Sequence, residues 1–204
     1  QLACSVPPEI TARTGMDAIT QLLESYISCR AQPIPQALCL QGLKLAIPAL
    51  PEVVENGNSR NGREAMAHAA LLSGIALANS GLGMAHGVAP ALGIHCRISH
   101  GLACAMMLPA TLKANLSVRQ QEYATIYRFL YPNQTHSEIQ AAELLIEEIQ
   151  QLNDRLQIPR RLADVGVNPS QIPALVTSSR GNSMSGNPRE ITDEELTQIL
   201  ESLL

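Results

Sequence analysis

Three polar side chains stand out in a part of the sequence that is otherwise apolar. Asp17 lies in a stretch whose apolar residues have helical spacing, and Gln21 follows one turn later on the same face. His86 and His100 each follow a short glycine- or serine-containing segment. Ionised carboxylates and imidazoles in a charge-poor core need partners, and one divalent metal would partner all of them. An Asp/His/His set completed by solvent or substrate suits Fe(II) or Zn(II). The alternative is that both histidines are core residues bonded to the backbone.

The other histidines, and the cysteine nearest the proposed site, have simpler interpretations. His95 precedes His100 by five residues, and we expect it to face solvent in a loop rather than to replace a ligand. His68 lies between two alanines on a predicted buried helix and is expected in the core, whereas His136 is expected at the surface. Cys104 is near the proposed metal site in the sequence, but its neighbours are apolar, which favours packing over a nucleophilic role.

Composition narrows the class of protein. The chain has 204 residues, enough for one large domain or two small ones. With 46% hydrophobic and 16% charged residues it is not a disordered chain. A net charge of −4 and an aromatic content of 2% argue against a nucleic-acid partner. A core built from Ala, Leu, Ile, Val and Met favours helices over β-sandwiches.

The cysteine content and the first residues of the sequence indicate in which cellular compartment the protein is expected. The five cysteines are an odd number and form no CxxC pair, so we expect reduced, packed thiols rather than a disulfide framework. We expect no signal peptide from the first residues of the sequence. Both features predict a cytoplasmic protein.

Apolar periodicity predicts about nine helices and no strand of more than a few residues, hence an all-α domain over residues 1–204. Prolines 48 and 51 are expected to close the second helix, and Thr192 with Glu195 forms a capping box for the last. Between residues 65 and 112 the one charged residue is Arg97. This lack of charge predicts central helices that are buried on most of their surface. The Gly, Ser, His and Asn content of the same region argues against a membrane span. The expected helices cover residues 12–28, 36–50, 65–80, 84–92, 102–115, 118–130, 137–156, a short stretch ending near 177, and 192–204.

Four segments, in order along the chain, resemble the iron-containing alcohol dehydrogenase family. They are TARTGMDAIT (residues 11–20), GIALANSGLGMAHG (74–87), HGLACAMMLP (100–109) followed by Asn115, and the late Asn-Pro-Arg element (187–189). Each is weak alone, but their order across nearly the whole chain makes the resemblance specific.

The resemblance implies the helical C-terminal domain of the dehydroquinate synthase-like fold. In that family an N-terminal α/β domain carries the glycine-rich NAD(P) phosphate site. We expect that domain to be absent from this chain, since no glycine-rich phosphate loop follows a strand. The chain then corresponds to the metal- and substrate-binding half of a dehydrogenase, and the fragment alone should be inactive.

Carried over residue by residue, the resemblance gives a mixed ligand set. Asp17, His86 and His100 match three of the four metal ligands of the family, and the 14-residue spacing of the two histidines fits. The second ligand position holds Gln21 instead of His, and a neutral amide is a poorer donor to Fe(II) or Zn(II). Pro90 stands where many members carry a further His near the substrate, so a proton-relay group is missing.

Two interpretations follow from this pattern. In the first, Asp17, His86 and His100 hold the metal, and the full-length protein interconverts an alcohol and its aldehyde or ketone with NAD(P). The expected partners are a small alcohol or carbonyl substrate, a nucleotide-binding domain upstream or in trans, and a further copy in a homo-oligomer. In the second, Gln21 and Pro90 mark a degenerate site, and the chain is a non-catalytic binding or scaffold domain.

Overall fold

The computed structural model describes residues 2–204, with side chains from Ala3 onward, and this part of the chain contains eight α-helices and no strand. The predicted all-α fold is confirmed. Four short 3-10 helices complete the secondary structure. The α-helices are α1 (Pro8–Ile27), α2 (Pro33–Glu55), α3 (Arg60–Ser80), α4 (Met84–Cys96), α5 (His100–Leu130), α6 (Glu138–Arg155), α7 (Ile172–Ser178) and α8 (Asp193–Ser202).

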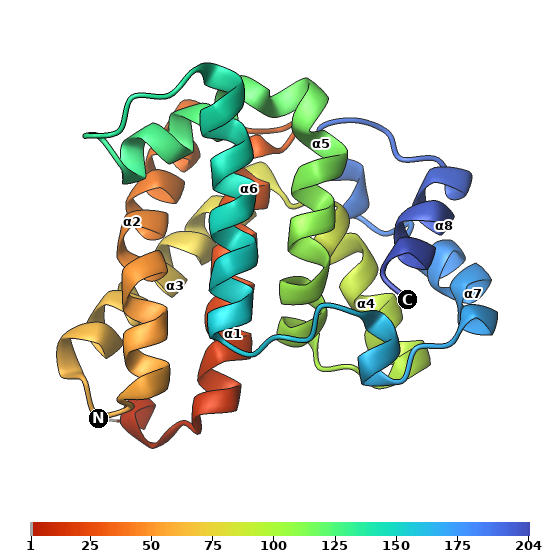
Figure 1. The fold of residues 1–204 in the computed structure, drawn as a ribbon, viewed down its shortest axis with the longest axis horizontal. Coiled ribbons are helices and arrows are strands. Elements are labelled where there is room, and N and C mark those ends of the chain that lie inside the picture. Colours follow the sequence, from red (N-terminus) through yellow and green to blue (C-terminus); the bar gives the residue numbers. More distant parts are fainter. Residues whose placement is uncertain (1) are drawn as a thin grey trace.

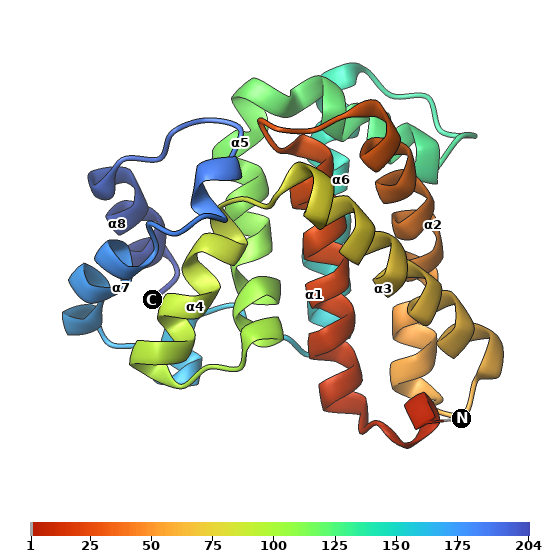
Figure 2. The same cartoon turned by 180° about the vertical axis from the view of Figure 1, so that it is seen from behind.

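The central helix α1 packs against α2, α3 and α5 (Figures 1 and 2). Its residues Met16, Ile19, Leu22 and Leu23 are completely buried. Helix α5 packs against α1, α4 and α6, while α7 packs against α4 and α8. Helix α6 covers one face of the molecule, and α3 and α4 lie on the opposite face, on either side of α1 (Figure 2).

Helix α2 runs five residues past its predicted end because two prolines are accommodated inside it. A proline lacks the N–H that an interior helical residue donates four positions back. Pro48 and Pro51 therefore leave the carbonyls of Lys44 and Ile47 without their helical partners. Leu43, Leu50 and Val53 are completely buried, so the helix continues because its apolar side chains pack against α1 and α3.

Helix α5 joins two segments that the sequence predicted as separate helices, which is why the described chain has eight α-helices instead of nine. The junction is a kink at Arg119, with φ −133° and ψ 22°. The Arg119 guanidinium donates from Nε to the carbonyl of Ile27 at 2.8 Å, at the C-terminal end of α1. This bond ties the kink to the central helix.

The prediction that the charge-poor region is buried on most of its surface is wrong for α3. This helix packs on α1 and α2 with one face only. On the other face Leu71 is 59% and Ile75 is 42% exposed. His68 is also exposed, so its predicted core position is wrong. The apolar composition of α3 reflects an open apolar face rather than a central position.

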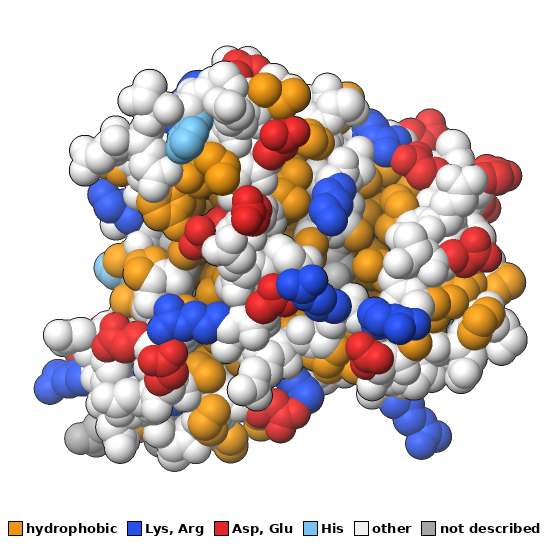
Figure 3. All heavy atoms as spheres, in the orientation of Figure 1, with side chains coloured by type: hydrophobic (Ala, Val, Ile, Leu, Met, Phe, Trp, Pro, Cys, Tyr) orange, Lys and Arg blue, Asp and Glu red, His pale blue; other side chains and the backbone are white. Residues whose placement is uncertain are grey.

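By length and composition alone, helices α2 and α5 are long and apolar enough to cross a membrane. Helices α3 and α4, which meet at a bend of 103°, would form a third candidate span if the pair were counted as one. In the folded domain, 50% of the most apolar window of α2 and 61% of that of α5 are buried. Packing between helices accounts for that apolarity here. On the face shown in Figure 3, basic side chains are interspersed with acidic ones.

Candidate metal centre

A close approach of α1 to α5 places two of the predicted site residues side by side. Gly101 follows His100 in the first turn of α5, and a Cβ there would collide with the backbone carbonyl oxygen of Arg13 on α1. Only a residue without a side chain allows the two backbones to come this close. Asp17, one turn after Arg13, thereby faces the start of α5.

The third site residue is placed by an unusual cap on α4. Gly83 occupies the N-cap and offers no side chain, so residues from elsewhere accept the first N–H groups of the helix. Glu24 Oε1 accepts from the amide of Ala85 at 2.7 Å, and Asn187 Oδ1 accepts from that of Met84 at 3.2 Å. A Cβ at Gly83 would lie 2.9 Å from Glu24 Oε1 and 3.1 Å from Asn187 Oδ1. The negative charge of Glu24 is also favourable at a helix N-terminus.

The cap extends to the side chain of His86. Its Nδ1 lies 2.6 Å from Glu24 Oε2, and its Nε2 lies 3.1 Å from Asp17 Oδ1. Glu24 is 1% and His86 4% exposed. The imidazole is therefore held at both nitrogens, with Nε2 directed at Asp17.

Asp17, His86, His100 and Cys104 form one compact cluster. His100 Nε2 lies 3.7 Å from Asp17 Oδ1 and 3.6 Å from Cys104 Sγ. One ligand atom from each of the four residues lies within 4.8 Å of all the others. The side chains of Asp17 and His100 are 24% and 49% exposed, so one side of the cluster is open.

Burial and neighbouring groups shift the pKa values of Asp17, His86 and Cys104. Burial acts to raise the pKa of Asp17, but the hydrogen bond to His86 and the charges of His86 and His100 outweigh it and lower the pKa. Burial acts to lower the pKa of His86, but hydrogen bonds to Asp17, Cys104 and Glu24 raise it to about 12. Burial raises the pKa of Cys104 to about 11. The raised pKa favours the protonated form of His86, whose two ring nitrogens face Glu24 and Asp17.

The cluster has the chemistry of a transition-metal site. A carboxylate oxygen, two imidazole nitrogens and a sulfur are donors that Zn(II) and Fe(II) accept. Glu24 on Nδ1 of His86 repeats the carboxylate–histidine arrangement that orients metal-bound imidazoles. The residues present fit a divalent metal.

Other residues weighed from the sequence lie differently. The side-chain oxygen of Gln21 accepts a hydrogen bond from Ser73 Oγ at 2.8 Å. Pro90 is exposed on α4, one turn after His86. His95 is exposed as expected, although in the last turn of α4 rather than in a loop, and its Nε2 lies 2.8 Å from Ser178 Oγ.

Sequence reasoning missed the role of Glu24 and the position of Cys104. Glu24 lies seven residues after Asp17, two turns along the same helix face, in an otherwise apolar stretch. Cys104 lies one turn after His100 on α5. Helical spacing from a candidate ligand was the available signal in both cases. Cys104 is fully buried, which agrees with the packing role expected of it, but it also lies beside the predicted ligands.

The late Asn-Pro-Arg element has a structural role beside this site. The amides of Asn187 and Asn115 bond reciprocally, each Nδ2 donating to the other's Oδ1 at 3.0 Å. Asn187 also caps α4, so the segment before α8 is joined to both α4 and α5.

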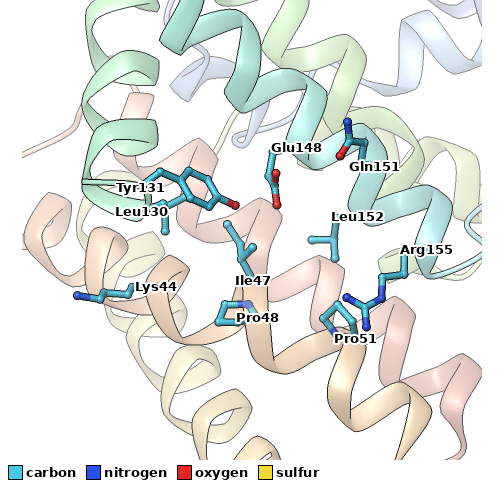
Figure 4. Close-up of a pocket in the computed structure, with 10 residues that line it drawn as sticks. All are labelled: Lys44, Ile47, Pro48, Pro51, Leu130, Tyr131, Glu148, Gln151, Leu152 and Arg155. Carbon is cyan, nitrogen blue, oxygen red and sulfur yellow. The ribbon is translucent and has the colours of Figure 1, made fainter. Parts of the chain in front are cut away.

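A separate hollow of about 540 Å³ lies between α2, α6 and the end of α5 (Figure 4). Lys44, Pro48, Tyr131, Glu148 and Arg155 are among its lining residues, and the Tyr131 hydroxyl points at the Glu148 carboxylate. Burial and the bond to Glu148 raise the pKa of Tyr131. None of the four cluster residues lines this hollow, so it is distinct from the candidate metal centre.

The sequence was compared with models of known protein families. The family model described as "Fe-containing alcohol dehydrogenase family, C-terminal" matches residues 11–204. The chain belongs to this family. The resemblance inferred from the four sequence segments is confirmed.

Individual members of the Fe-containing alcohol dehydrogenase family agree in sequence and in fold. The 1,3-propanediol dehydrogenase of Citrobacter freundii is 37% identical over 196 residues, which cover 95% of this chain and 50% of that protein. The NAD-dependent methanol dehydrogenase of Bacillus methanolicus is 31% identical over 206 residues, covering 100% and 54%. An alcohol dehydrogenase structure from Oenococcus oeni superposes with a TM-score of 0.94 at 32% identity, covering 98% and 53%. A crystal structure of 1,3-propanediol oxidoreductase gives 0.95 at 33% identity, with the same coverage. The chain thus spans about half the length of the relatives it matches.

Proposed function

We propose that this chain is the metal- and substrate-binding part of an NAD(P)-dependent alcohol dehydrogenase that interconverts an alcohol and its aldehyde or ketone. The observation that carries the proposal is the convergence of Asp17, His86 and His100 from three helices on one partly open point. The relatives named above act, by their names, on propanediol and methanol. A small alcohol or carbonyl compound is the substrate class that these names support.

In this proposal Asp17, His86 and His100 hold Fe(II) or Zn(II), with Gln21 as a weaker candidate at the second ligand position of the family. When bound, such an ion supplies Lewis-acid stabilisation of the charge on the alcohol or carbonyl oxygen. Glu24 keeps His86 oriented, and the exposed edge of His100 marks the side from which substrate approaches. Pro90 has no titratable group, so the side chain one turn after His86 takes no part in proton transfer.

The nucleotide is proposed to be bound by a further domain, upstream or in trans. The chain spans half of its relatives, and the cluster opens on one side. Residues 1–204 would form a single helical domain that is inactive alone, because hydride transfer needs the nicotinamide beside the substrate. A homo-oligomer is compatible with the apolar face of α3. We place the protein in the cytoplasm, where its free cysteines stay reduced, and propose neither a nucleic-acid nor a membrane partner.

A second candidate is a non-catalytic relative that keeps the fold and has lost the metal. Two observations favour it: the side-chain oxygen of Gln21 is engaged by Ser73, and Pro90 supplies no polar group. Such a chain would act as a binding or scaffold domain.

Metal content decides between these functions. The 204-residue chain is incubated with Fe(II) or Zn(II), desalted and analysed by inductively coupled plasma mass spectrometry beside the variant His86→Ala. About one metal per chain, lost in the variant, supports the dehydrogenase. Near-zero metal in both proteins supports the non-catalytic domain.

A further inference from the structure

Cys104 is the fourth member of the cluster. The family's metal site has four protein ligands, and Gln21, at one of those positions, is a poor donor. We infer that Cys104, and not Gln21, supplies the fourth protein ligand of the metal centre, and that the thiolate selects Zn(II) over Fe(II). This inference rests on the metal site of the proposed function.

The spacing of the donor atoms supports this assignment. Donors bonded to one tetrahedral zinc at about 2.0–2.3 Å lie about 3.3–3.8 Å from one another. Cys104 Sγ lies 3.6 Å from His100 Nε2, which lies 3.7 Å from Asp17 Oδ1. The sulfur also lies within 4.8 Å of the ligand atoms of Asp17 and His86. The sulfur is therefore grouped with all three other donors and lies closest, among the printed distances, to His100 Nε2.

The helix places Cys104 without any rearrangement. It follows His100 by four residues on α5, and side chains at that spacing share one helix face. Cys104 is fully buried, so its sulfur lies on the protein side of the cluster, and the open side at His100 stays free for substrate. Zinc sites can add a fifth partner during a reaction, so four protein donors do not close the centre to substrate.

Gln21 is occupied elsewhere. Its side-chain oxygen, the one atom of the amide that could bind a cation, accepts a hydrogen bond from Ser73 Oγ at 2.8 Å. Ser73 is itself buried, with 1% exposure, and donates from α3. The carbonyl oxygen of Ala70 lies 2.9 Å from the same hydroxyl, so Ser73 has a second acceptor besides Gln21.

Zinc binding would convert the Cys104 thiol to a thiolate. On binding, the S–H bond of Cys104 and the Nε2–H bond of protonated His86 break, Zn–S and Zn–N bonds form, and both protons are released to solvent. The thiolate then adds a negative donor to the carboxylate of Asp17, while Glu24 stays on Nδ1 of His86. Thiolate donors also bind zinc in preference to the harder ions.

X-ray absorption at the zinc edge tests the inference directly on the 204-residue chain loaded with Zn(II). We expect one sulfur at about 2.3 Å with the remaining donors at about 2.0–2.2 Å. The sulfur shell should vanish in Cys104→Ser and persist in Gln21→Ala. Cys39→Ser is the matched control, since Cys39 is equally buried but lies on α2, outside the cluster. It should keep the sulfur shell.

Substitution with Co(II) gives a second readout, a thiolate charge-transfer absorption that should disappear in Cys104→Ser alone. Bound zinc surrounded by nitrogen and oxygen only would overturn the assignment of Cys104 while the metal site of the proposed function stands. No bound metal in the wild-type chain would overturn both. Loss of the sulfur signal in Gln21→Ala, with Cys104 intact, would also contradict the assignment.

Discussion

The Glu24 carboxylate of α1 lies 2.6 Å from Nδ1 of His86 on α4, across 62 positions of sequence. The same carboxylate accepts the amide N–H of Ala85, so one buried side chain both starts helix α4 and orients its imidazole. Because Nδ1–H is committed to Glu24, the nitrogen left to bind a metal is Nε2, which faces Asp17.

This relationship predicts that Glu24→Gln weakens metal binding. The amide carries no charge and cannot accept at both positions, so the imidazole is held less firmly and is a weaker base. Loss of such a partner typically lowers metal affinity about 10- to 100-fold. Competition titration with a chromogenic zinc chelator measures the change. Glu143→Gln, at an exposed position on α6, is the control and should leave the affinity unaltered. Equal affinity of wild type and Glu24→Gln would contradict the role assigned to Glu24.

The contact between α1 and α5 predicts that Gly101→Ala destabilises the fold. The added methyl group would meet the carbonyl oxygen of Arg13, and backbone cannot rotate away as a side chain does. Overpacking of this kind costs about 1–3 kcal/mol, measured by urea unfolding. Gly74→Ala is the matched control, because a Cβ there has nothing within 4 Å. On an exposed helix position it should stabilise by about 0.5–1 kcal/mol. A Gly101→Ala variant as stable as wild type would show that the helices can separate freely.

Much of this architecture was accessible from the sequence, because apolar spacing and glycine or proline punctuation reflect local physics. The three residues Asp17, His86 and His100 were found because polar groups in a charge-poor region need partners. Glu24 was missed because one acid on a long helix gives no sign of its partner on another helix. Cys104 was interpreted as a packed residue because its neighbours in sequence are apolar, whereas in space it lies beside His100 and within the same cluster as Asp17.

The predictions of helix ends and of burial were wrong where tertiary contacts override local sequence preference. Pro48 and Pro51 ended a helix in the sequence-based prediction, yet packing carries α2 through both. His68 was expected in the core because its helix is apolar, and only the fold shows that α3 leaves one apolar face open. The predicted capping box of α8 is half formed: the Thr192 hydroxyl accepts from the amide of Glu195, while the Glu195 carboxylate pairs with Arg189.

That ion pair predicts a pH dependence of stability. The hydrogen bond to Arg189 lowers the pKa of Glu195 below its usual 4.5. Between the lowered pKa and the usual value, the unfolded chain therefore binds more protons than the folded chain. The ion pair then stabilises the fold at a pH above this range. Glu195→Gln should therefore lower the free energy of unfolding at about pH 7 by no more than about 1 kcal/mol, because the pair is partly exposed. The difference should shrink as pH falls through the lowered pKa. Urea unfolding at both ends of this range measures it, with Glu194→Gln as an exposed control. A difference that grows toward acid pH would show the sign to be wrong.

The ligand assignment makes a last prediction about the second position. Gln21 lies one turn after Asp17, where an imidazole could reach the same ion. In the Cys104→Ala background one donor is missing, so Gln21→His should restore most of the zinc affinity that Cys104→Ala removes. In the wild-type background the same change adds a donor to a site that already has four, and the gain should be much smaller. Isothermal titration of the four proteins gives the coupling between the two positions. Equal gains in both backgrounds would mean that Cys104 does not contribute a ligand, and no gain in either would place residue 21 outside the metal's reach.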